Sequence, residues 1–543
     1  MIGKRQKKLK EKLSNSFGEA KDEFFDFGRI EKHFRKKNDS TAFQIISDKT
    51  SNDLDLDEVF TFLDRTNSKI GQQYLYNKLR TIPNDSSKTS RDEEIIDRLS
   101  KDSELRIALQ IQLSKLNNTE AYYITTLFQD EHPKPPKWFF AVRLLSLFAF
   151  ATLLMTIVSL KAFPLLVVVF AINTWIHIWN KKNLYEYLSS LPQLLKMNDV
   201  AKTLIRTDIG KEINPDIYRS TGIIDKIKHH LSLFTLETKL QGDLQQAVWL
   251  IAELLKTLFL IEPLFLFHIL KELDTKRTEI EDVFTFVGEI DTLISIASLR
   301  KGLKHYCLPT ISKEKTLTAK NVFHPLIPNC VENSIRIGTK SILLTGSNMS
   351  GKTSFIRTIG INTITGQTIN TCFADEFSLS KMNIFSAIRI SDDLMNDKSY
   401  YFEEVLTIKA MIDSSTNGKT NLFLLDEIFK GTNTIERISA GKAVLSALSK
   451  ENNIVFVSTH DIELADLLKN EYELYHFSEI VDHKSVDFDY KLKEGKLKDR
   501  NAIRILQIND YPEELIQEAI EISKELDRLS AINYQQANLQ QKE

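Results

Sequence analysis

The chain has 543 residues, of which 42% are hydrophobic and 27% charged, a composition typical of folded domains rather than disordered chains. This length is enough for about three or four domains, and the formal net charge of -2 favours no particular class of charged partner. Three cysteines without metal-ligand spacing exclude a disulfide-rich secreted scaffold and fit a reducing cytosol.

Residues 1–50 are predicted to form a basic helical arm. The opening MIGKRQKKLKEKL is a block of positive charge that suits an anionic surface, either lipid headgroups or a phosphate backbone. The alternative interpretation is the solvated end of a helix. Residues 51–132 have a helical pattern with few glycines or prolines, and EHPKPPK (Glu131–Lys137) is predicted to be a stiff linker.

Residues 133–182 are predicted to be a transmembrane helical hairpin. The stretch from Trp138 to Trp179 is almost uncharged and is about twice the roughly 20 residues that span a bilayer as a helix. The sequence around Lys161 and Pro164 interrupts it, which predicts two helices, 144–160 and 163–179, joined by a tight turn.

The flanks of this stretch predict its orientation. Lys134 and Lys137 precede it, Lys181 and Lys182 follow it, and basic flanks stay on the cytoplasmic side. We therefore expect anchoring in the inner (cytoplasmic) membrane through residues 138–179, with the rest of the chain facing the cytoplasm. The alternative is a buried core hairpin in a cytoplasmic protein.

Residues 183–304 are again predicted to be helical. Within them, the apolar run 248–270 is interrupted by Glu253, Lys256 and Glu262, and Pro263 kinks it. Charges at bilayer depth cost several kcal/mol. This run is therefore predicted to be a buried or partner-facing helix and not a further span.

Residues 305–510 are predicted to form an α/β domain with a mostly parallel sheet. The short apolar runs SILLTG, NLFLLDE and NIVFVSTH are separated by helical patterns, which is the signature of this class. From 511 to 543 the chain returns to charged helix.

GSNMSGKT (Gly346–Thr353) matches the P-loop pattern, and it follows an apolar strand and precedes a helix, as that motif requires. The loop backbone and the helix N-terminus bind phosphates. Lys352 is predicted to reach the β- and γ-phosphates of ATP and Thr353 to hold Mg²⁺. The predicted nucleotide contacts are Gly346, Ser347, Asn348, Met349, Ser350, Gly351, Lys352, Thr353 and Ser354.

Two further strands supply the predicted catalytic groups. NLFLLDE ends in Asp426, expected to bind the Mg²⁺ shell, and Glu427, expected to orient the attacking water. NIVFVSTH ends in His460, which is placed to sense the γ-phosphate by a hydrogen bond. The chain is therefore predicted to be an ATPase.

Together with SDDLMNDKSYYFEE (391–404), these elements resemble the MutS family of DNA mismatch-repair ATPases. The chain has TGSNMSGKT where that family has a form such as TGPNMGGKS, and LDEIFKGTNT where it has MDEIGRGTST. The resemblance extends upstream into 54–82 and over FHPLI (323–327). It implies an ATPase domain of the ABC type that is C-terminal to an all-α core and lever domain. In this chain the core and lever domain is split into 51–132 and 183–304.

The resemblance also implies partners and further site residues. It implies a homodimer in which Ser399 reaches the partner's γ-phosphate, with the C-terminal helices of 511–543 as dimerisation elements. Phe323 and His324 match the segment near the adenine. DNA is the ligand that the resemblance implies.

Three departures from the family pattern change these expectations. The mismatch-reading domain is expected to be lacking, the apolar hairpin stands where relatives insert a DNA clamp, and Asp397 replaces a glycine of the signature. The leading hypothesis is a membrane-anchored, MutS-like ATPase that binds DNA without reading mismatches. The alternatives are a membrane mechanochemical or scaffold ATPase acting on proteins without DNA, a transporter of the ATP-binding-cassette kind, and a soluble repair protein.

Overall fold

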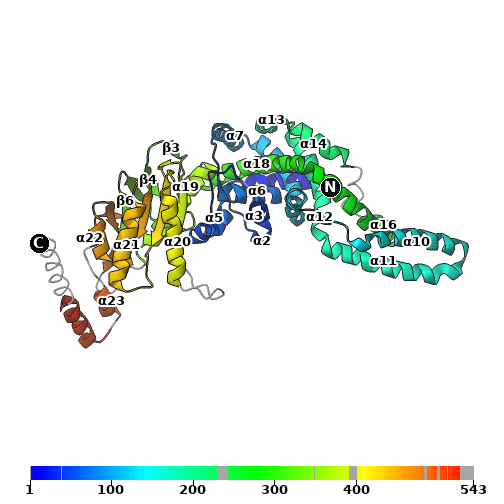
Figure 1. Cartoon of the computed structure of the whole chain (residues 1–543). Helices are drawn as coiled ribbons and strands as arrows, with labels where there is room; N and C mark the ends of the chain where they lie inside the picture. The colour runs from blue at the N-terminus through cyan, green and yellow to red at the C-terminus, as the bar shows by residue number, and fades with distance from the viewer. Residues whose placement is uncertain are drawn as a thin grey trace. The chain divides into compact units, whose positions relative to one another are not determined.

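The computed structural model describes residues 2–37, 40–228, 243–347, 349–389, 400–481, 486–497, 502–509 and 511–525 (Figure 1). The chain divides into two compact units. Unit 1 consists of Met1–Ile45 and Asp57–Lys304, and unit 2 consists of Ile46–Leu56 and His305–Glu543. The short segment Ile46–Leu56 thus clusters with unit 2, whereas the sequence pattern divides it between the N-terminal arm and the helical core.

Among the described residues of unit 1, the regular elements are helices and the two-residue strands β1 (Gln44–Ile45) and β2 (Thr81–Ile82), which pair antiparallel. Its helices are α1 (Ile2–Asn15), α2 (Phe27–Ile30), α3 (Lys32–Lys36), α5 (Leu56–Leu63), α6 (Lys69–Arg80), α7 (Thr89–Lys101), α8 (Ser103–Leu113), α9 (Thr126–Gln129), α10 (Phe140–Val158), α11 (Phe163–Asn183), α12 (Tyr185–Leu204), α13 (Asp208–Ile213), α14 (Ile217–Lys226), α16 (Asp243–Leu258), α17 (Ile261–Leu273) and α18 (Arg277–Gly302).

The 26-residue helix α18 forms the centre of unit 1, and it is buried continuously from Val287 to Arg300. Helices α6, α7, α12 and α14 pack around it. Asp291 on α18 is fully buried and accepts hydrogen bonds from the backbone nitrogens of Asn67 and Ser68, both at 2.8 Å. Because these are donors at the start of α6, the carboxylate holds that helix end against α18.

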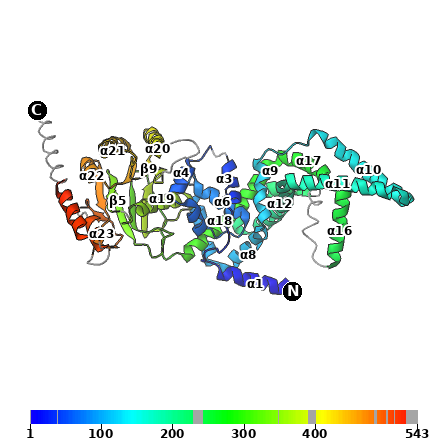
Figure 2. The ribbon, with the colours of Figure 1, turned by 90° about the horizontal axis from the view of Figure 1, so that it is seen from below.

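Helices α10 and α11 form a hairpin that runs side by side away from the other helices of unit 1 (Figures 1 and 2). A 3₁₀ turn at Leu160–Ala162 joins them, and Pro164 lies in the first turn of α11, where its missing N–H costs nothing. The segments Lys137–Val158 and Leu160–Asn183 have mean hydropathies of 2.1 and 1.8, and most of their residues are exposed. By length and composition both can cross a membrane.

The apolar run at 248–270, predicted to be one kinked helix, is two helices. Helix α16 ends at Leu258 and α17 begins at Ile261, and Leu260 between them has left-handed backbone (φ 51°). The break therefore precedes Pro263, which lies within the first turn of α17 where proline is tolerated.

Unit 2 has an α/β fold, as predicted. Its six-stranded sheet has the order β14-β11-β6-β10-β9-β8, in which all neighbouring pairs are parallel except β11 with β14. A four-stranded sheet has the order β3-β7-β4-β5, and β12 pairs with β13. The strands are β3 (Thr310–Ser312), β4 (Leu317–Val322), β5 (Asn333–Ile337), β6 (Ser341–Thr345), β7 (Glu376–Ser380), β8 (Asn383–Ala387), β9 (Asn421–Asp426), β10 (Ile454–Ser458), β11 (Tyr472–His476), β12 (Glu479–Val481), β13 (Val486–Phe488) and β14 (Lys493–Glu494).

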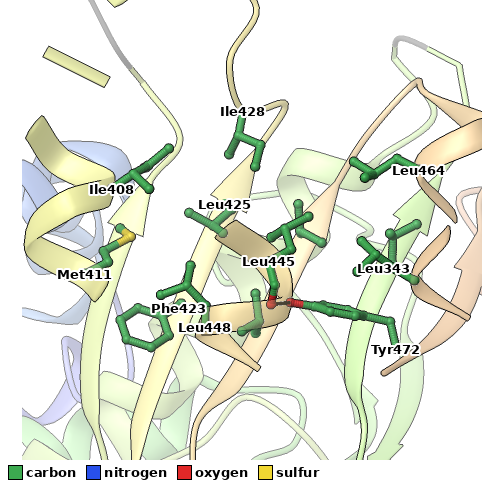
Figure 3. Close-up of a cluster of buried hydrophobic side chains, with 14 of the residues drawn as sticks. Leu343, Ile408, Met411, Phe423, Leu425, Ile428, Leu445, Leu448, Leu464 and Tyr472 are labelled. Atoms are coloured by element: carbon green, nitrogen blue, oxygen red, sulfur yellow. Dashed lines mark hydrogen bonds between the residues drawn. The ribbon is translucent and has the colours of Figure 1, made fainter. Parts of the chain in front are cut away.

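Helices cover both faces of the six-stranded sheet. The helices of unit 2 are α4 (Asp48–Asp53), α19 (Lys352–Ile369), α20 (Tyr400–Ser415), α21 (Thr434–Leu448), α22 (Ile462–Leu468) and α23 (Ala502–Ile508), and residues 513–525 are also helical. Phe423 and Leu425 of β9 join α20, α21 and α22 in one apolar core (Figure 3). Leu424, between them, faces α19, as strand alternation requires. The central strands are buried on both sides for this reason.

Helix α4 holds the end of β8 through hydrogen bonds within unit 2. The buried Asp53 carboxylate accepts hydrogen bonds from Ser386 Oγ (2.6 Å) and from the backbone nitrogens of Ile388 (3.0 Å) and Arg389 (2.9 Å). Asp55 pairs with Arg389 and, at 3.0 Å, with Arg357 of α19. The segment Ile46–Leu56 thus connects the helix after the P-loop with the strand that leads into residues 390–399.

Candidate nucleotide-binding site

The P-loop follows β6 and requires backbone that only glycine adopts readily. Gly346 has φ 149° and Gly351 has φ 107°, and a Cβ on Gly346 would lie 2.6 Å from the carbonyl oxygen of Phe477. Met349 also has positive φ (69°), and its side chain is exposed. Ser350 Oγ donates to the carbonyl of Ser347 at 2.8 Å, which closes the loop.

Lys352 lies at the first position of α19 and is almost fully buried. Its Nζ donates to the carbonyl oxygens of Gly346 (2.8 Å) and Ser347 (2.7 Å). Burial lowers the pKa of this ammonium, and the neighbouring Glu427 and Asp426 carboxylates oppose that shift. A buried ammonium that donates to carbonyls of the P-loop is well placed for an anionic ligand on that loop.

The parallel strands bring an oxygen-rich group to the loop. Thr353 Oγ1 donates to Asp426 Oδ2 at 2.7 Å, and Ser458 Oγ donates to Asp426 Oδ1. Asp426 ends β9 and Ser458 ends the neighbouring β10, where the two residues are register partners. A hydroxyl and a carboxylate are oxygen ligands of the kind that Mg²⁺ prefers.

Glu427 lies between the side chains of His460 and Lys430 at the same edge of the sheet. Its Oε1 is 2.6 Å from His460 Nε2, and its Oε2 pairs with Lys430 Nζ. Burial favours protonation of this carboxyl, but the hydrogen bonds from His460 and Lys430 outweigh burial and lower its pKa to about 2. Glu427 is therefore ionised at neutral pH.

The turn that carries Glu427 is braced from α20. Glu427 and Phe429 both have left-handed backbone, with φ of 51° and 61°. The buried Glu404 accepts a hydrogen bond from the backbone nitrogen of Phe429 at 2.6 Å. Because Glu404 is buried, its pKa is raised, and the hydrogen bond from Phe429 opposes that shift.

These groups line a cavity of about 490 Å³, within the size range of small-molecule sites. Part of the lining comes from the P-loop with the start of α19, and another part, which includes Ile327, Pro328 and Val331, comes from the segment between β4 and β5. The lining residues include Ile327, Pro328, Cys330, Val331, Asn333, Lys352, Thr353, Glu427, Phe477 and Tyr490.

Two of the predicted nucleotide contacts, Phe323 and His324, are not among the residues that line the cavity. Phe323 packs against the rings of His305 and Phe373, with centroids 4.8 and 5.9 Å away. His324 is buried, and its Nδ1 accepts from the backbone nitrogen of Leu326 at 3.2 Å. The cavity is lined instead by the residues that follow them, from Ile327 to Val331. Asn348 and Ser399 lie outside the described residues.

The structure adds residues that the sequence analysis did not assign to the site. The Tyr490 ring lies 3.3 Å from the position a Cβ would take on Gly351, and its carbonyl accepts from Asn333 Nδ2 at 3.0 Å. Lys430 and Ser458 contact the two carboxylates directly. Lys430 lies in the motif LDEIFKGTNT, where a cation next to the acidic pair was visible, but nothing in the sequence singles out Tyr490.

The residues present fit a magnesium nucleotide. The glycine loop leaves room for phosphates beside Lys352, and the Thr353–Asp426 pair offers oxygen ligands. Across the described ranges, no group of three or more His, Cys, Asp or Glu side chains is arranged to hold a metal ion alone. A Mg²⁺ ion would thus take its remaining ligands from the phosphates and water, as is usual for this ion.

Comparison with known proteins points to the same part of the chain. Residues 342–527 match the family MutS domain V, the ATPase domain of MutS proteins. The chain is 29% identical over 276 residues to "DNA mismatch repair protein MutS" of Aquifex pyrophilus, which covers 48% of the chain and 31% of that protein. It is 30% identical over 255 residues to the protein of the same name from Listeria monocytogenes serotype 4a (strain HCC23), which covers 44% and 29%.

A eukaryotic relative gives a similar match. The chain is 28% identical over 282 residues to "DNA mismatch repair protein MSH3" of Saccharomyces cerevisiae (strain YJM789), covering 49% of the chain and 27% of that protein. The matches thus span less than a third of each relative, while they cover nearly half of this chain. The part that carries the site is related to the ATPase domain of MutS proteins.

Proposed function

We propose that the chain hydrolyses ATP with Mg²⁺ and uses the cycle to open and close a MutS-like dimer. The hydrogen bond between Thr353 Oγ1 and Asp426 Oδ2 (2.7 Å), next to the buried Lys352, carries this proposal. Lys352 would bind the β- and γ-phosphates, and Thr353 and Asp426 would hold the ion. Glu427, kept ionised by His460 and Lys430, would orient water toward the γ-phosphate.

The proposed ligand of the helical unit is DNA, without selection for mismatches. The names of the relatives support the DNA part. Residues near the N-terminus pack onto the helical core: the guanidinium of Arg106 lies 3.6 Å from the ring centre of Phe17, and Gly18 donates to Ser298 Oγ at 3.0 Å. The basic helix α1 is the proposed contact for anionic backbone or lipid.

Membrane anchoring through α10 and α11 is the third part of the proposal. Exposed Leu, Ile, Val and Phe side chains cover both helices over lengths that suit a bilayer. With basic residues on both flanks, the rest of unit 1 and all of unit 2 would remain on the cytoplasmic side.

The second candidate is a membrane-anchored mechanochemical or scaffold ATPase that acts on protein partners without DNA. The exposed hairpin and the formal net charge of -2 favour it. Both candidates use the same nucleotide site, so they differ only in what stimulates hydrolysis.

The experiment is an ATPase assay of the full chain, purified in detergent and reconstituted in vesicles. Homoduplex, mismatched and branched DNA are added at several salt concentrations. Stimulation by DNA that falls steeply with salt, without preference for mismatches, is expected, because phosphate contacts release counterions. Absence of stimulation at low salt would favour the protein-partner candidate.

A further inference from the structure

Helix α16 has an inverted distribution of polarity. Leu250, Ile251, Leu254 and Leu255 are 44–58% exposed, whereas Lys256, in the next position, is only 6% exposed. A surface helix in water shows the opposite pattern, with its charges outside and its leucines buried. Phe265 of α17 is also 42% exposed. The exposed face of α16 from Leu250 to Leu255, with Phe265 at the start of α17, is therefore apolar.

The charges that made a lipid location of this run unfavourable are paired with one another. Lys256 Nζ lies 3.4 Å from Glu262 Oε1 and 3.6 Å from Glu253 Oε2. Glu253 Oε1 also lies 3.3 Å from His177 Nε2 of α11 and pairs with Lys181. The charges of the two carboxylates, Glu253 and Glu262, and the two ammonium groups, Lys181 and Lys256, cancel. Glu253 contacts α11 of the hairpin through Lys181 and His177.

The backbone groups freed by the break between α16 and α17 are also satisfied by the hairpin. Asn173 Nδ2 of α11 donates to the carbonyl of Leu258 at 2.6 Å, and Ser146 Oγ of α10 donates to that of Phe259 at 2.8 Å. Leu260, which has the left-handed backbone, is fully buried with Val142 and Ile176. Broken helices occur at membrane depth only where protein covers the free backbone in this way.

The contacts also place the break along the hairpin. Ser146 is eight residues after Trp138 and Asn173 is six residues before Trp179. At 1.5 Å per residue, the break lies roughly 10 Å beyond the two tryptophans. This is within the nearer half of a hydrocarbon core that is about 30 Å thick. Figure 2 shows α16 beside the part of α11 that joins the rest of unit 1.

We propose that α16 and α17 form a re-entrant element embedded in the cytoplasmic leaflet, with lipid acyl chains covering its exposed apolar face. This inference rests on the proposed anchoring by α10 and α11. It differs from the expectation of a buried or partner-facing helix because the charges turn inward and the apolar side chains turn outward. It also makes the membrane-embedded part a four-helix assembly instead of a simple hairpin.

The experiment uses the full chain with an environment-sensitive fluorescent amino acid at a single exposed position, in vesicles with or without brominated lipids. Position 254 tests α16, position 147 of α10 tests the hairpin, and position 218 of α14 is the aqueous control. Leu254, Leu147 and Tyr218 are 46%, 68% and 66% exposed, so replacement perturbs little packing. Retained ATP hydrolysis checks that each labelled chain is folded.

Bromines are expected to quench most of the emission at 254 and 147 and none at 218. At 254, bromines near the headgroup should quench more strongly than those near the end of the acyl chain. Quenching at 147 without quenching at 254 would overturn the re-entrant element and leave the hairpin anchor in place. Lack of quenching at both positions would overturn the anchor as well, and stronger quenching at 254 by the deeper bromines would contradict the shallow placement.

Discussion

At the residue scale, the state of the nucleotide site depends on how Glu427 is held. His460 and Lys430 keep its pKa at about 2, against the effect of burial. Because the folded-state pKa lies below the ordinary value, these pairs contribute stability above about pH 4.3, and the contribution is lost as the pH falls toward 2. Within the functional pH range, the carboxylate is an ionised and fixed acceptor for a water proton.

Lys430→Met is expected to move the acid limb of kcat/KM to higher pH. Burial still favours protonation of Glu427, while one of the two groups that lower its pKa is gone. The measurement is a pH profile of kcat/KM for the variant and the unchanged chain with the same substrate, so that protonation of ATP affects both equally. Lys313→Met, at an exposed position, is the control. Coincident acid limbs would contradict the assigned role of Lys430.

Glu427→Gln is expected to bind ATP but to hydrolyse it about 100-fold more slowly or worse, which is the usual loss for a missing general base. The measurement pairs binding of a fluorescent nucleotide with single-turnover hydrolysis. Glu463→Gln, on an exposed part of α22, should behave like the unchanged chain. Rapid turnover by Glu427→Gln would assign the base to another residue.

Lys352→Ala is expected to weaken nucleotide binding by at least about tenfold, because a charge-assisted contact contributes roughly 1.5–3 kcal/mol. Equilibrium binding of a labelled nucleotide measures the effect, and circular dichroism checks the fold. Lys313→Ala is the matched control. Unchanged affinity would remove the phosphate-binding role of Lys352.

At the scale of elements, α4 is a short helix from an early part of the chain that braces unit 2. Asp53 satisfies a hydroxyl and two backbone donors at the end of β8, and Asp55 pairs with Arg357 of α19. Residues 390–399 follow directly, and the family resemblance places a composite-site serine there. The brace therefore sets where that segment begins.

Asp53→Ala is expected to lower the free energy of unfolding of unit 2 by about 2–4 kcal/mol, because it leaves buried donors without an acceptor. Chemical denaturation followed by a probe in unit 2 measures the change. Asn52→Ala, exposed on the same helix, should change stability by less than about 0.5 kcal/mol. Equal effects of the two substitutions would contradict the bracing role of Asp53.

At the scale of the whole molecule, the proposal requires two chains for each complete nucleotide site. The matched relatives are longer proteins, and the match covers less than a third of each. Outside residues 342–527, which match MutS domain V, the chain carries the apolar hairpin with α16 and α17, which under the proposal would hold a dimer at a membrane.

A mixture of Lys352→Ala chains with Ser399→Ala chains is expected to recover part of the activity that each variant lacks alone. In a mixed dimer, the Ser399→Ala chain supplies an intact P-loop and its partner supplies Ser399, so one composite site is complete. Steady-state ATPase assays of the separate and mixed variants measure this. Failure to recover activity in a mixture shown to contain mixed dimers would place the action of Ser399 within its own chain.

Much of unit 2 was predictable because its signals are local. The glycines at positive-φ positions of the loop and the four apolar residues before Asp426 each lie within a short stretch of sequence. The lining from the segment between β4 and β5 was less predictable, since Phe323 and His324 do not line the cavity, whereas Ile327 to Val331 do. In an irregular segment the side chains follow no periodic pattern, so the sequence does not predict which of them line a cavity.

The sequence by itself determined the α/β unit, the P-loop with its acidic partners, and two apolar helices long enough to span a bilayer, because each depends on periodicity or a local motif. Only the tertiary structure decided that Lys430 and Tyr490 join the site, that Asp53 belongs to unit 2, and that the charges of α16 and α17 are buried in pairs. These facts depend on which distant residues meet. Burying a charge within an apolar run is unfavourable when the charge is alone and less so when an opposite charge lies beside it. Which opposite charge lies there depends on the tertiary structure.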